Sequence, residues 1–472
     1  MSKSVSICVV GSGYVGLVAS VCFAEIGHKV ICVDNDQTKV ERLRSGEVPI
    51  FEHFLPELLA RHLNKGVTFT TDLGSSVRAC EAIFIAVGTP QSATGSADLS
   101  YVEAVASEVA RSIDGYKVIV EKSTVPVYTN EWIRRVLERH GVPQEHFDIV
   151  SNPEFLREGT AVVDFLHPDR IVVGAGSPAA RDVMERIYAP LTSGTYYDRT
   201  DSLPGPLSPS NPAQILVTSA QSSEIIKHAS NAFLALKISF INAVATLCES
   251  VDADVNDVAK GMGMDGRIGP KFLRAGVGYG GSCFPKDLAA FRWIAEQQGV
   301  NFNLLAEVEH INSRQKLAFF NKVRAALWTL RGKRIAALGL AFKGDTDDIR
   351  ESPAIDLIKM LLEAGSIIVA HDPAAMERAR QVLPPGPQLS YVEDPYEAAR
   401  EADALLILTD WQEYATLDLE KLHSALRFPI VIDGRNLYEP DFMLEQGFTY
   451  LSVGRPSVRA VRQGQRGKAL LT

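Results

Sequence analysis

Apolar runs and helical spacing alternate at the start of the chain. Residues 5–10 form an apolar run that stops at the glycine-rich segment 11–16, and apolar side chains then recur every three or four positions up to Ile26. Gly27 ends this helical pattern, and residues 29–33 form a second apolar run that stops at Asp34. The order of run, helical pattern and run predicts a βαβ unit.

The same alternation continues along the chain and predicts an α/β protein. Helical patterns separate the later apolar runs, as expected for a doubly wound parallel sheet. We therefore expect an N-terminal Rossmann-type domain over residues 1–200 and a second, Rossmann-like α/β domain over residues 329–454. The apolar runs lie at 82–87, 117–120, 147–150 and 170–173 in the first domain, and at 334–340, 367–370, 404–408 and 430–432 in the second, which also has a helical pattern near 353–364.

Two long helical patterns lie between these domains. They cover residues 222–250 and 302–327 and predict a central long-helix domain over residues 214–328. Helices of this length are found both in protein interiors and at subunit interfaces. The pattern leaves these two possibilities open, and a homodimer or higher homo-oligomer is one of them.

Two further segments lack apolar periodicity. Residues 201–213 are rich in proline and serine, which predicts a mobile linker or surface insertion. Residues 455–472 contain basic side chains and no acidic one, which predicts a flexible, solvated tail or, alternatively, a contact with an acidic partner. The basic residues of this tail are Arg455, Arg459, Arg462, Arg466 and Lys468.

Length and charge narrow the class of protein. A chain of 472 residues is too long for a single hydrophobic core, and its composition of 46% hydrophobic and 22% charged residues is that of a globular protein. The net charge of −9 disfavours a nucleic-acid partner and favours a small substrate. The N-terminus lacks the features of a secretory signal, and no apolar run reaches about 18 residues. We expect a cytoplasmic protein without a membrane partner.

The six cysteines divide into two kinds. Five of them lie in or beside apolar segments and are expected to be buried: Cys8, Cys22, Cys32, Cys80 and Cys248. None belongs to a Cys-x-x-Cys pair, so we expect neither a disulfide framework nor a metal site. Cys283 is different because it follows a glycine-rich stretch, 276–281, and precedes Lys286 and Asp287. Exposed amides and cations stabilise a thiolate, so Cys283 is the candidate nucleophile.

The glycine-rich segment after the first strand predicts a dinucleotide site. Gly11, Gly13 and Gly16 have the G-x-G-x-x-G spacing that allows a tight turn, close approach of a pyrophosphate, and close packing of helix on strand. Asp34 follows the second strand, where an acid binds the ribose 2′-hydroxyl and repels the 2′-phosphate of NADP. The predicted cofactor is NAD. A glycine turn that serves packing alone is the alternative.

Polar residues at strand ends and on one helix complete the candidate site. The loops 88–90, 123–126 and 152–154 are expected to border the ligand crevice. Glu154 and Glu158 would share a helix face if a helix began at Pro153, as Lys227 and Asn231 would on the long helix. The two carboxylates could act in general acid/base catalysis. The cation and the amide on the long helix could stabilise an oxyanion. Taken alone, both pairs are better explained by helix-start and solvated-face preferences.

These segments together resemble the UDP-glucose 6-dehydrogenases of the UDP-glucose/GDP-mannose dehydrogenase family. The resemblance covers all three predicted domains in order. The segment 280–287, Gly-Gly-Ser-Cys-Phe-Pro-Lys-Asp, is its most specific part. The insertion at 200–213, Arg157 and the basic tail fall outside the family pattern. The other matching segments are 11–16, 122–126, 152–159, Lys227 with Asn231, 267–273 and Phe342-Lys343.

The resemblance implies a four-electron oxidation of UDP-glucose to UDP-glucuronate by NAD. Cys283 would form a thiohemiacetal and then a thioester, which water hydrolyses. Lys227 and Asn231 would stabilise the oxyanion, and Glu154 would act as acid/base with Glu158 near the nicotinamide. Thr124 and Asp287 would hold the catalytic water and the lysine.

The resemblance also implies the ligand contacts. The cofactor-binding residues are expected to be Gly11, Gly13, Tyr14, Val15, Gly16, Asp34, Lys39, Thr89, Thr124, Glu158 and Arg350. The residues expected to bind the sugar nucleotide are Glu154, Phe155, Leu156, Arg157, Lys227, Asn231, Arg267, Phe272, Gly276, Gly280, Phe342, Lys343 and Arg435. Arg267 would reach the substrate of a neighbouring subunit, which implies a homodimer. Arg350 and Arg435 each have a surface ion pair as the alternative role.

Other functions remain open on the sequence alone. GDP-mannose or an N-acetylated UDP-hexosamine is an alternative substrate, because pocket shape decides between them. A two-electron hydroxyacid dehydrogenase shares the nucleotide fold but needs no thiol. A non-catalytic nucleotide-sugar sensor has no evident use for Cys283.

Overall fold

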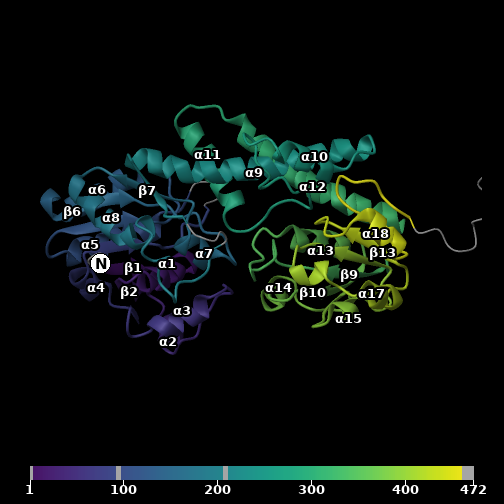
Figure 1. Cartoon of the computed structure of the whole chain (residues 1–472), viewed down its shortest axis with the longest axis horizontal. Helices are drawn as coiled ribbons and strands as arrows, with labels where there is room; N and C mark the ends of the chain where they lie inside the picture. Colours follow the sequence, from purple (N-terminus) through teal and green to yellow (C-terminus); the bar gives the residue numbers. More distant parts are fainter. Residues whose placement is uncertain (1–3, 92–96, 206–210, 460–472) are drawn as a thin grey trace, which may run out of the picture. The chain divides into compact units, whose positions relative to one another are not determined.

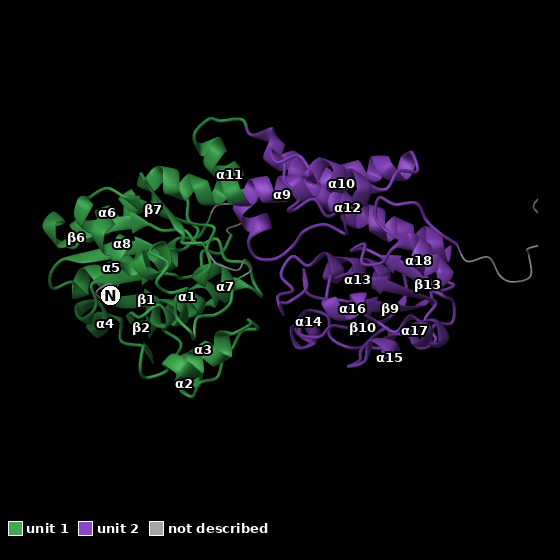
Figure 2. Cartoon of the chain, in the orientation of Figure 1, with its two compact units in different colours: residues 1–230, 289–301 green, residues 231–288, 302–472 purple. Residues whose placement is uncertain are grey.

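The computed structural model describes residues 4–91, 97–205 and 211–459 of the chain (Figure 1). The chain divides into two compact units (Figure 2). Unit 1 comprises Met1–Ser230 and Ala289–Asn301, and unit 2 comprises Asn231–Leu288 and Phe302–Thr472. The segment 214–328, expected to form a central domain, is therefore shared between the units.

Unit 1 contains an eight-stranded sheet with the order β3-β2-β1-β4-β5-β6-β7-β8. The first six strands have the 3-2-1-4-5-6 order of a Rossmann fold, which confirms the predicted fold class. Its strands are β1 (Ser6–Val10), β2 (Lys29–Val33), β3 (Val67–Thr70), β4 (Ala82–Ile85), β5 (Lys117–Glu121), β6 (Phe147–Ser151), β7 (Arg170–Ala175) and β8 (Gln214–Thr218). Its helices are α1 (Tyr14–Glu25), α2 (Gln37–Arg44), α3 (Leu55–His62), α4 (Leu73–Ala79), α5 (Ser100–Ser112), α6 (Thr129–Arg139), the 3₁₀ turn η1 (Gln144–His146), α7 (Ala161–Leu166) and α8 (Pro178–Thr192).

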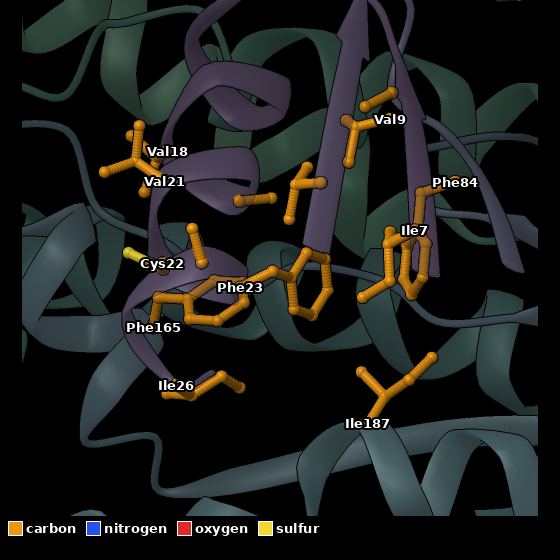
Figure 3. Packing of buried hydrophobic residues seen from close by; sticks show 14 of the residues in the cluster. Ile7, Val9, Val18, Val21, Cys22, Phe23, Ile26, Phe84, Phe165 and Ile187 are labelled. Atoms are coloured by element: carbon orange, nitrogen blue, oxygen red, sulfur yellow. The ribbon is translucent and has the colours of Figure 1, made fainter. Parts of the chain in front are cut away.

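Aromatic packing fixes α1 on the sheet of unit 1. The Phe23 ring lies 4.8 Å from that of Phe84 on β4 and 5.0 Å from that of Phe165 on α7, centroid to centroid (Figure 3). Rings at these distances and tilted angles add to the stabilisation from their burial. This cluster holds the helix that follows the glycine-rich turn.

The sheet of unit 1 departs from the expected all-parallel pattern at one pair. β7 pairs with β6 in the antiparallel direction. The connection between them contains only α7, a helix of 6 residues. Such a helix advances the chain by about 9 Å, too little to return it along the whole strand for a parallel crossover.

Unit 2 contains a six-stranded sheet, all parallel, with the order β11-β10-β9-β12-β13-β14. This is the Rossmann order again, as predicted for the second α/β domain. Its strands are β9 (Arg334–Leu338), β10 (Ile367–His371), β11 (Leu389–Tyr391), β12 (Ala404–Ile407), β13 (Ile430–Asp433) and β14 (Thr449–Leu451). Its helices are α10 (Val255–Gly263), α12 (Asn303–Leu327), α13 (Pro353–Glu363), α14 (Met376–Val382), α15 (Pro395–Ala399), α16 (Gln412–Ala415), α17 (Leu419–Ala425) and α18 (Pro440–Glu445).

The turn after β9 occupies the same place in its sheet as the turn after β1, but its acidic residue has different partners. Asp372 follows β10 as Asp34 follows β2, and its carboxylate accepts the N–H groups of Leu340 at 2.7 Å and Ala341 at 3.1 Å. The Trp411 indole N–H lies 3.3 Å from the same oxygen. Asp372, which takes the place of a ribose-binding acid in this second turn, is therefore engaged in hydrogen bonds within unit 2.

Two helices cross the boundary between the units. They are α9 (Ala220–Ser250) and α11 (Phe284–Gln297). α9 is long and apolar enough to span a membrane by length and composition. However, it contributes Lys227, Asn231 and Asn242 to contacts buried within the units, which is typical of a core helix.

The start of the predicted tail is folded, which corrects the expectation for Arg455. Its guanidinium is buried, lies 3.0 Å from Asp254 Oδ2 and pairs with Glu439. Val458 forms a β-bridge with Tyr450. A buried cation needs such partners, and these lie far away in sequence. The rest of the tail, 460–472, lies outside the described residues.

The described ends of the predicted linker are anchored in unit 1. The N–H of Leu203 donates to the Tyr196 hydroxyl at 3.0 Å, and that of Ala213 donates to the Leu191 carbonyl at 3.1 Å. Residues 206–210 of this linker lie outside the described residues. Because β8 begins directly at Gln214, the segment leads into the edge strand of the sheet.

Candidate active site

The glycine-rich turn after β1 has the shape that a dinucleotide requires. Gly11 has φ +99°, and a Cβ there would lie 2.7 Å from the Ala86 carbonyl oxygen. A Cβ on Gly16 would lie 1.8 Å from the Gly11 carbonyl oxygen, so the helix packs directly on the turn. Gly13 faces open space, and no side chain caps the N-terminus of α1. Free N–H groups and room beside them fit a pyrophosphate.

Asp34 is held as an ionised acceptor at the end of β2. Its Oδ2 accepts hydrogen bonds from the Ser12 N–H at 2.8 Å and the Ser12 hydroxyl at 2.6 Å, and it lies 3.0 Å from Lys39 Nζ. Burial opposes ionisation, but these hydrogen bonds outweigh it and lower the pKa of Asp34. Lys39, predicted to bind the cofactor, therefore pairs with the predicted ribose acceptor.

Glu52 joins the glycine-rich turn to the loop after β6, and the sequence analysis missed it. Its Oε2 accepts the Gly159 N–H at 2.8 Å and pairs with the Tyr14 hydroxyl, which also accepts the Gly159 N–H at 2.8 Å. Burial raises the pKa of Glu52 despite these hydrogen bonds. A lone acid between Phe51 and His53 gave no sequence signal.

Glu154 and Lys227 form a buried ion pair within unit 1. Lys227 Nζ on α9 lies 2.8 Å from Glu154 Oε1, and both side chains are less than a tenth exposed. Glu154 Oε2 accepts the Leu156 N–H at 2.6 Å. The Lys227 ammonium also lies 5.5 Å from the centre of the Phe155 ring. Sequence alone favoured a solvated face for Lys227, whereas the structure buries it against the loop after β6.

The expectation that Glu154 and Glu158 share a helix face is wrong. Residues 152–157 form no helix, and α7 begins at Ala161. The backbone donors of this loop go to side chains instead: Leu156 N–H to Glu154, Arg157 N–H to Asp164 and Gly159 N–H to Glu52. Side-chain acceptors of this kind compete with helix formation. Glu158 lies half-buried in this loop.

Arg157 is engaged beside the loop. Its Nε and Nη2 lie 3.0 and 2.6 Å from the carboxylate oxygens of Asp164, with the Arg157 side chain largely exposed. Leu156 is half-buried and packs against the core of unit 1.

The loops after β4 and β5 meet as predicted for strand ends. The Thr89 hydroxyl donates to the Thr124 carbonyl at 2.9 Å. Lys122, which precedes Thr124 by two positions, is buried, and its Nζ lies 3.2 Å from Asn152 Oδ1. Burial lowers the pKa of Lys122 to about 8. A lysine at the end of an apolar strand was the available signal for this residue, which the site prediction left out.

Cys283 lies in unit 2 directly before α11 and differs from the other cysteines. It is half-buried, whereas the other five are buried, as predicted. Burial raises the pKa of Cys80 to about 11 and that of Cys32 to about 12, which keeps these thiols protonated. The Cys283 carbonyl accepts the Asp287 N–H at 2.9 Å, so the thiol stands at a helix N-terminus, where negative charge is stabilised.

Asn231 and Asp287 form a second buried pair, within unit 2. Asn231 Nδ2 on α9 donates to Asp287 Oδ2 at 2.6 Å. Asp287 Oδ1 lies 3.5 Å from Lys286 Nζ. The hydrogen bond fixes the Asn231 amide with its nitrogen toward Asp287. Lys227 and Asn231 are one turn apart on the continuous helix α9.

The substrate candidates of unit 2 gather around the glycine-rich loop 276–281. A Cβ on Gly280 would lie 2.1 Å from the Glu351 carbonyl oxygen, and one on Gly281 would lie 2.8 Å from the Phe342 ring. Arg435 is half-buried, and its guanidinium donates to the carbonyls of Leu408 and Phe342, both at 2.8 Å. The surface ion pair considered for Arg435 is therefore wrong.

The remaining candidates lie beside this group or on the surface. The Phe272 ring lies 6.3 Å from that of Phe284, directly after Cys283. Arg267 is 90% exposed and pairs with Asp265. Arg350 pairs with Asp348 at 2.6 Å and is largely exposed, which is the surface ion pair considered for it. Over the described ranges, no group of three or more His, Cys, Asp or Glu side chains is arranged to hold a metal ion.

Comparison with protein-family models gives three matches in chain order. Residues 5–192 match the NAD binding domain of the UDP-glucose/GDP-mannose dehydrogenase family, residues 221–314 its central domain, and residues 336–440 its UDP binding domain. Together they cover most of the chain.

Individual relatives agree with these matches over nearly the whole length. A UDP-glucose 6-dehydrogenase of Rhizobium meliloti is 47% identical over 455 residues, which are 95% of this chain and 99% of the relative. The UDP-glucose 6-dehydrogenase TuaD of Bacillus subtilis is 44% identical over 461 residues, 98% and 95% of the two chains. A solved UDP-glucose dehydrogenase of Pyrobaculum islandicum superimposes with TM-score 0.85 at 38% identity, covering 96% and 99%.

Proposed function

The chain belongs to the UDP-glucose/GDP-mannose dehydrogenase family and is an NAD-dependent enzyme, and we propose that it oxidises UDP-glucose to UDP-glucuronate by two successive oxidations. The observation that carries this proposal is the half-buried thiol at the start of α11 beside the Asn231–Asp287 pair. A thiol so placed is what the second oxidation needs. The identity to UDP-glucose 6-dehydrogenases supports the choice of sugar nucleotide.

NAD would supply the hydride acceptor, one molecule for each oxidation, so the first NADH has to be replaced by a second NAD before the second hydride is lost. Residues of the glycine-rich turn, with Val15 and Asp34, would hold the cofactor. In the first oxidation the Lys227–Glu154 pair takes the proton of the sugar C6 hydroxyl, and the Lys227 cation stabilises the oxygen as the aldehyde forms. The 2.8 Å contact between the two groups supports this role, because a proton received by one is shared with the other.

In the second oxidation Cys283 supplies the nucleophile. Its thiolate sulfur adds to the aldehyde carbon, and the carbonyl electron pair moves to oxygen, where Asn231 and Lys227 stabilise the charge. Loss of the second hydride from this thiohemiacetal leaves a thioester. Glu154 first releases the proton of the first oxidation to solvent. A water molecule held by Thr124 then attacks the carbonyl carbon and gives a proton to Glu154. The carbon–sulfur bond breaks, the thiolate returns, and the carboxylate is released.

The scheme gives each of the two buried pairs a role. Lys227 belongs to unit 1 and Asn231 to unit 2, and α9 carries both. Asp287 orients Asn231, and Glu158 would contact the nicotinamide of bound NAD. The substrate contacts expected from the family remain part of the proposal: the Phe155–Arg157 loop, the loop from Phe272 through Gly276 and Gly280, Phe342, Lys343, and Arg435.

Counting NADH tests the reaction. Purified protein with UDP-glucose is expected to form two NADH per acid released. A ratio of one NADH per product molecule contradicts the thioester scheme, because the loss of a single hydride is a two-electron oxidation. Parallel assays with GDP-mannose and an N-acetylated UDP-hexosamine test the substrate, and higher kcat/KM for either contradicts UDP-glucose.

Removing the Asp34 carboxylate is expected to relax cofactor choice. Asp34→Ala should raise kcat/KM for NADP relative to NAD by about tenfold or more, since the lost repulsion is worth at least one to two kcal/mol. The check is kcat/KM for each cofactor. Asp36→Ala is a matched control, because Asp36 caps α2 through the Lys39 N–H. An unchanged ratio in Asp34→Ala contradicts the role.

We also propose that the enzyme is a homo-oligomer that pairs through α9. Phe233, Phe240 and Leu247 recur every seven residues and are 61%, 48% and 62% exposed, an apolar stripe along one helix face. Such a stripe is self-complementary in an antiparallel pair with a second copy. Arg267, exposed in one chain, then becomes available to a neighbouring substrate.

Placing a charge in this stripe is expected to dissociate the oligomer. Phe240→Asp should shift the mass measured by light scattering toward the monomer, because a carboxylate would be desolvated at the interface. Phe442→Asp makes the same change at an exposed phenylalanine of α18, outside the stripe, and controls for the added charge. An unchanged mass for Phe240→Asp contradicts the interface.

A further inference from the structure

The loop that leads to Cys283 contains no helix or strand. It runs from Gly276 to Gly281 and includes four glycines among six residues. Glycine gives the backbone more conformations than other residues do, so such a loop is ordered only if other groups hold it. A nucleophile at the end of an unrestrained loop would occupy many positions.

Three buried amides from the two long helices hold this loop, all within unit 2. Asn312 on α12 makes two hydrogen bonds with Tyr279, accepting its N–H at 2.9 Å and donating to its carbonyl at 3.0 Å. Asn242 on α9 accepts the Gly276 N–H at 2.9 Å. Gln315 on α12 donates to the Gly276 carbonyl at 2.8 Å.

Amides suit this task better than other polar side chains. A carboxamide offers both a donor and an acceptor, which match the N–H and C=O of one peptide residue. It carries no charge, so its burial is compensated by hydrogen bonds alone. Asn312, Asn242 and Gln315 are each less than a tenth exposed.

The glycines bring the loop backbone into direct contact with Asn312 and with the main chain at Gly434. Gly278 has φ +110°, and a Cβ there would lie 2.6 Å from Asn312 Oδ1. A Cβ on Gly276 would lie 2.7 Å from the Gly434 carbonyl oxygen. A side chain at Gly278 would therefore collide with Asn312, and one at Gly276 would collide with the Gly434 carbonyl.

We propose that Asn312 is a positioning residue for Cys283, and that Asn242 and Gln315 hold the other end of the same loop. Asn312 fixes Tyr279, four positions before the thiol, and thereby fixes where the sulfur stands at the start of α11. The expected effect of Asn312 on kcat rests on the proposed function. Its expected effect on the reactivity of the Cys283 thiol does not depend on that function.

Asn312→Asp tests this role with a near-isosteric change. The new carboxylate oxygen faces the Tyr279 carbonyl, so one hydrogen bond becomes a repulsion. We expect the rate of Cys283 alkylation by iodoacetamide, followed by peptide mass spectrometry, to change by about fivefold or more. We also expect kcat with UDP-glucose to fall about tenfold, with KM for NAD unchanged.

Asn436→Asp is the matched control. Asn436 holds Val453, which lies outside the loop 276–281, by the same two hydrogen bonds, both at 2.9 Å. It should lose similar thermal stability and keep the wild-type alkylation rate. If Asn312→Asp also keeps that rate, or if both variants change it equally, Asn312 has only a structural role and the inference is wrong.

A second variant covers the case in which Asn312→Asp does not fold. Gln315→Glu replaces the donor to the Gly276 carbonyl and should change the alkylation rate in the same way by about twofold or more. An unchanged rate in folded Gln315→Glu contradicts the inference. If the wild type does not oxidise UDP-glucose, the proposed function fails while the alkylation rates still decide the positioning role.

Discussion

Cys283→Ser is expected to bind NAD and UDP-glucose with wild-type affinity and to release no measurable acid. The sulfur is replaced by a smaller, neutral hydroxyl that does not ionise near neutral pH, so no thiohemiacetal forms. The loss in acid formation is on the order of 10³-fold or more, because a covalent nucleophile is removed. Chromatographic detection of the carboxylate, with calorimetric titration of both ligands, measures the two effects separately.

The other cysteines provide the control for this experiment. Cys248→Ser makes the same chemical change in unit 2, at a site buried in the hydrophobic core. It should lower thermal stability and keep acid formation within about twofold, because a buried hydroxyl costs folding energy but touches no substrate. Acid formation by Cys283→Ser at the rate of the Cys248→Ser variant would falsify the assignment of the nucleophile.

Local patterns predicted most of the fold. The run of residues 5–10, the glycine turn and Asp34 formed the βαβ unit as expected, because strand and helix periodicity depend on neighbouring residues. The direction of β7 was not predictable in this way. It depends on how far the short helix α7 carries the chain, which is a property of the whole connection.

The candidate site was less predictable, because its partners lie far apart in the sequence. Lys227 and Glu154 are separated by 73 positions, and their pairing reverses the solvated face that helix spacing alone suggests for Lys227. Glu52 and Asn312 gave no signal at all, since an isolated acid or amide has no pattern. The helix expected after Pro153 does not form, because side-chain acceptors, among them the distant Glu52, take its backbone donors.

The Lys227–Glu154 pair gives the second large expected effect. Lys227→Met should reduce kcat by about 10²-fold or more, because both proton removal and oxyanion stabilisation depend on this cation. It also leaves the Glu154 carboxylate buried beside a methionine. Breaking a buried pair in this way costs about 3–5 kcal/mol of folding free energy, so the unfolding temperature should fall.

A double-mutant cycle separates the two consequences. Lys227→Met with Glu154→Gln removes both charges, so the double variant should regain much of the stability that Lys227→Met loses. Its kcat should nevertheless stay as low as that of the weaker single variant, because two groups that share one proton act as a unit. Lys316→Met is the control: Lys316 pairs with Asp356 at 2.6 Å in a partly exposed site, where loss of a pair costs about 0–1 kcal/mol. Strictly additive losses in both kcat and stability would mean that Lys227 and Glu154 act independently, and the shared proton acceptor would have to be abandoned.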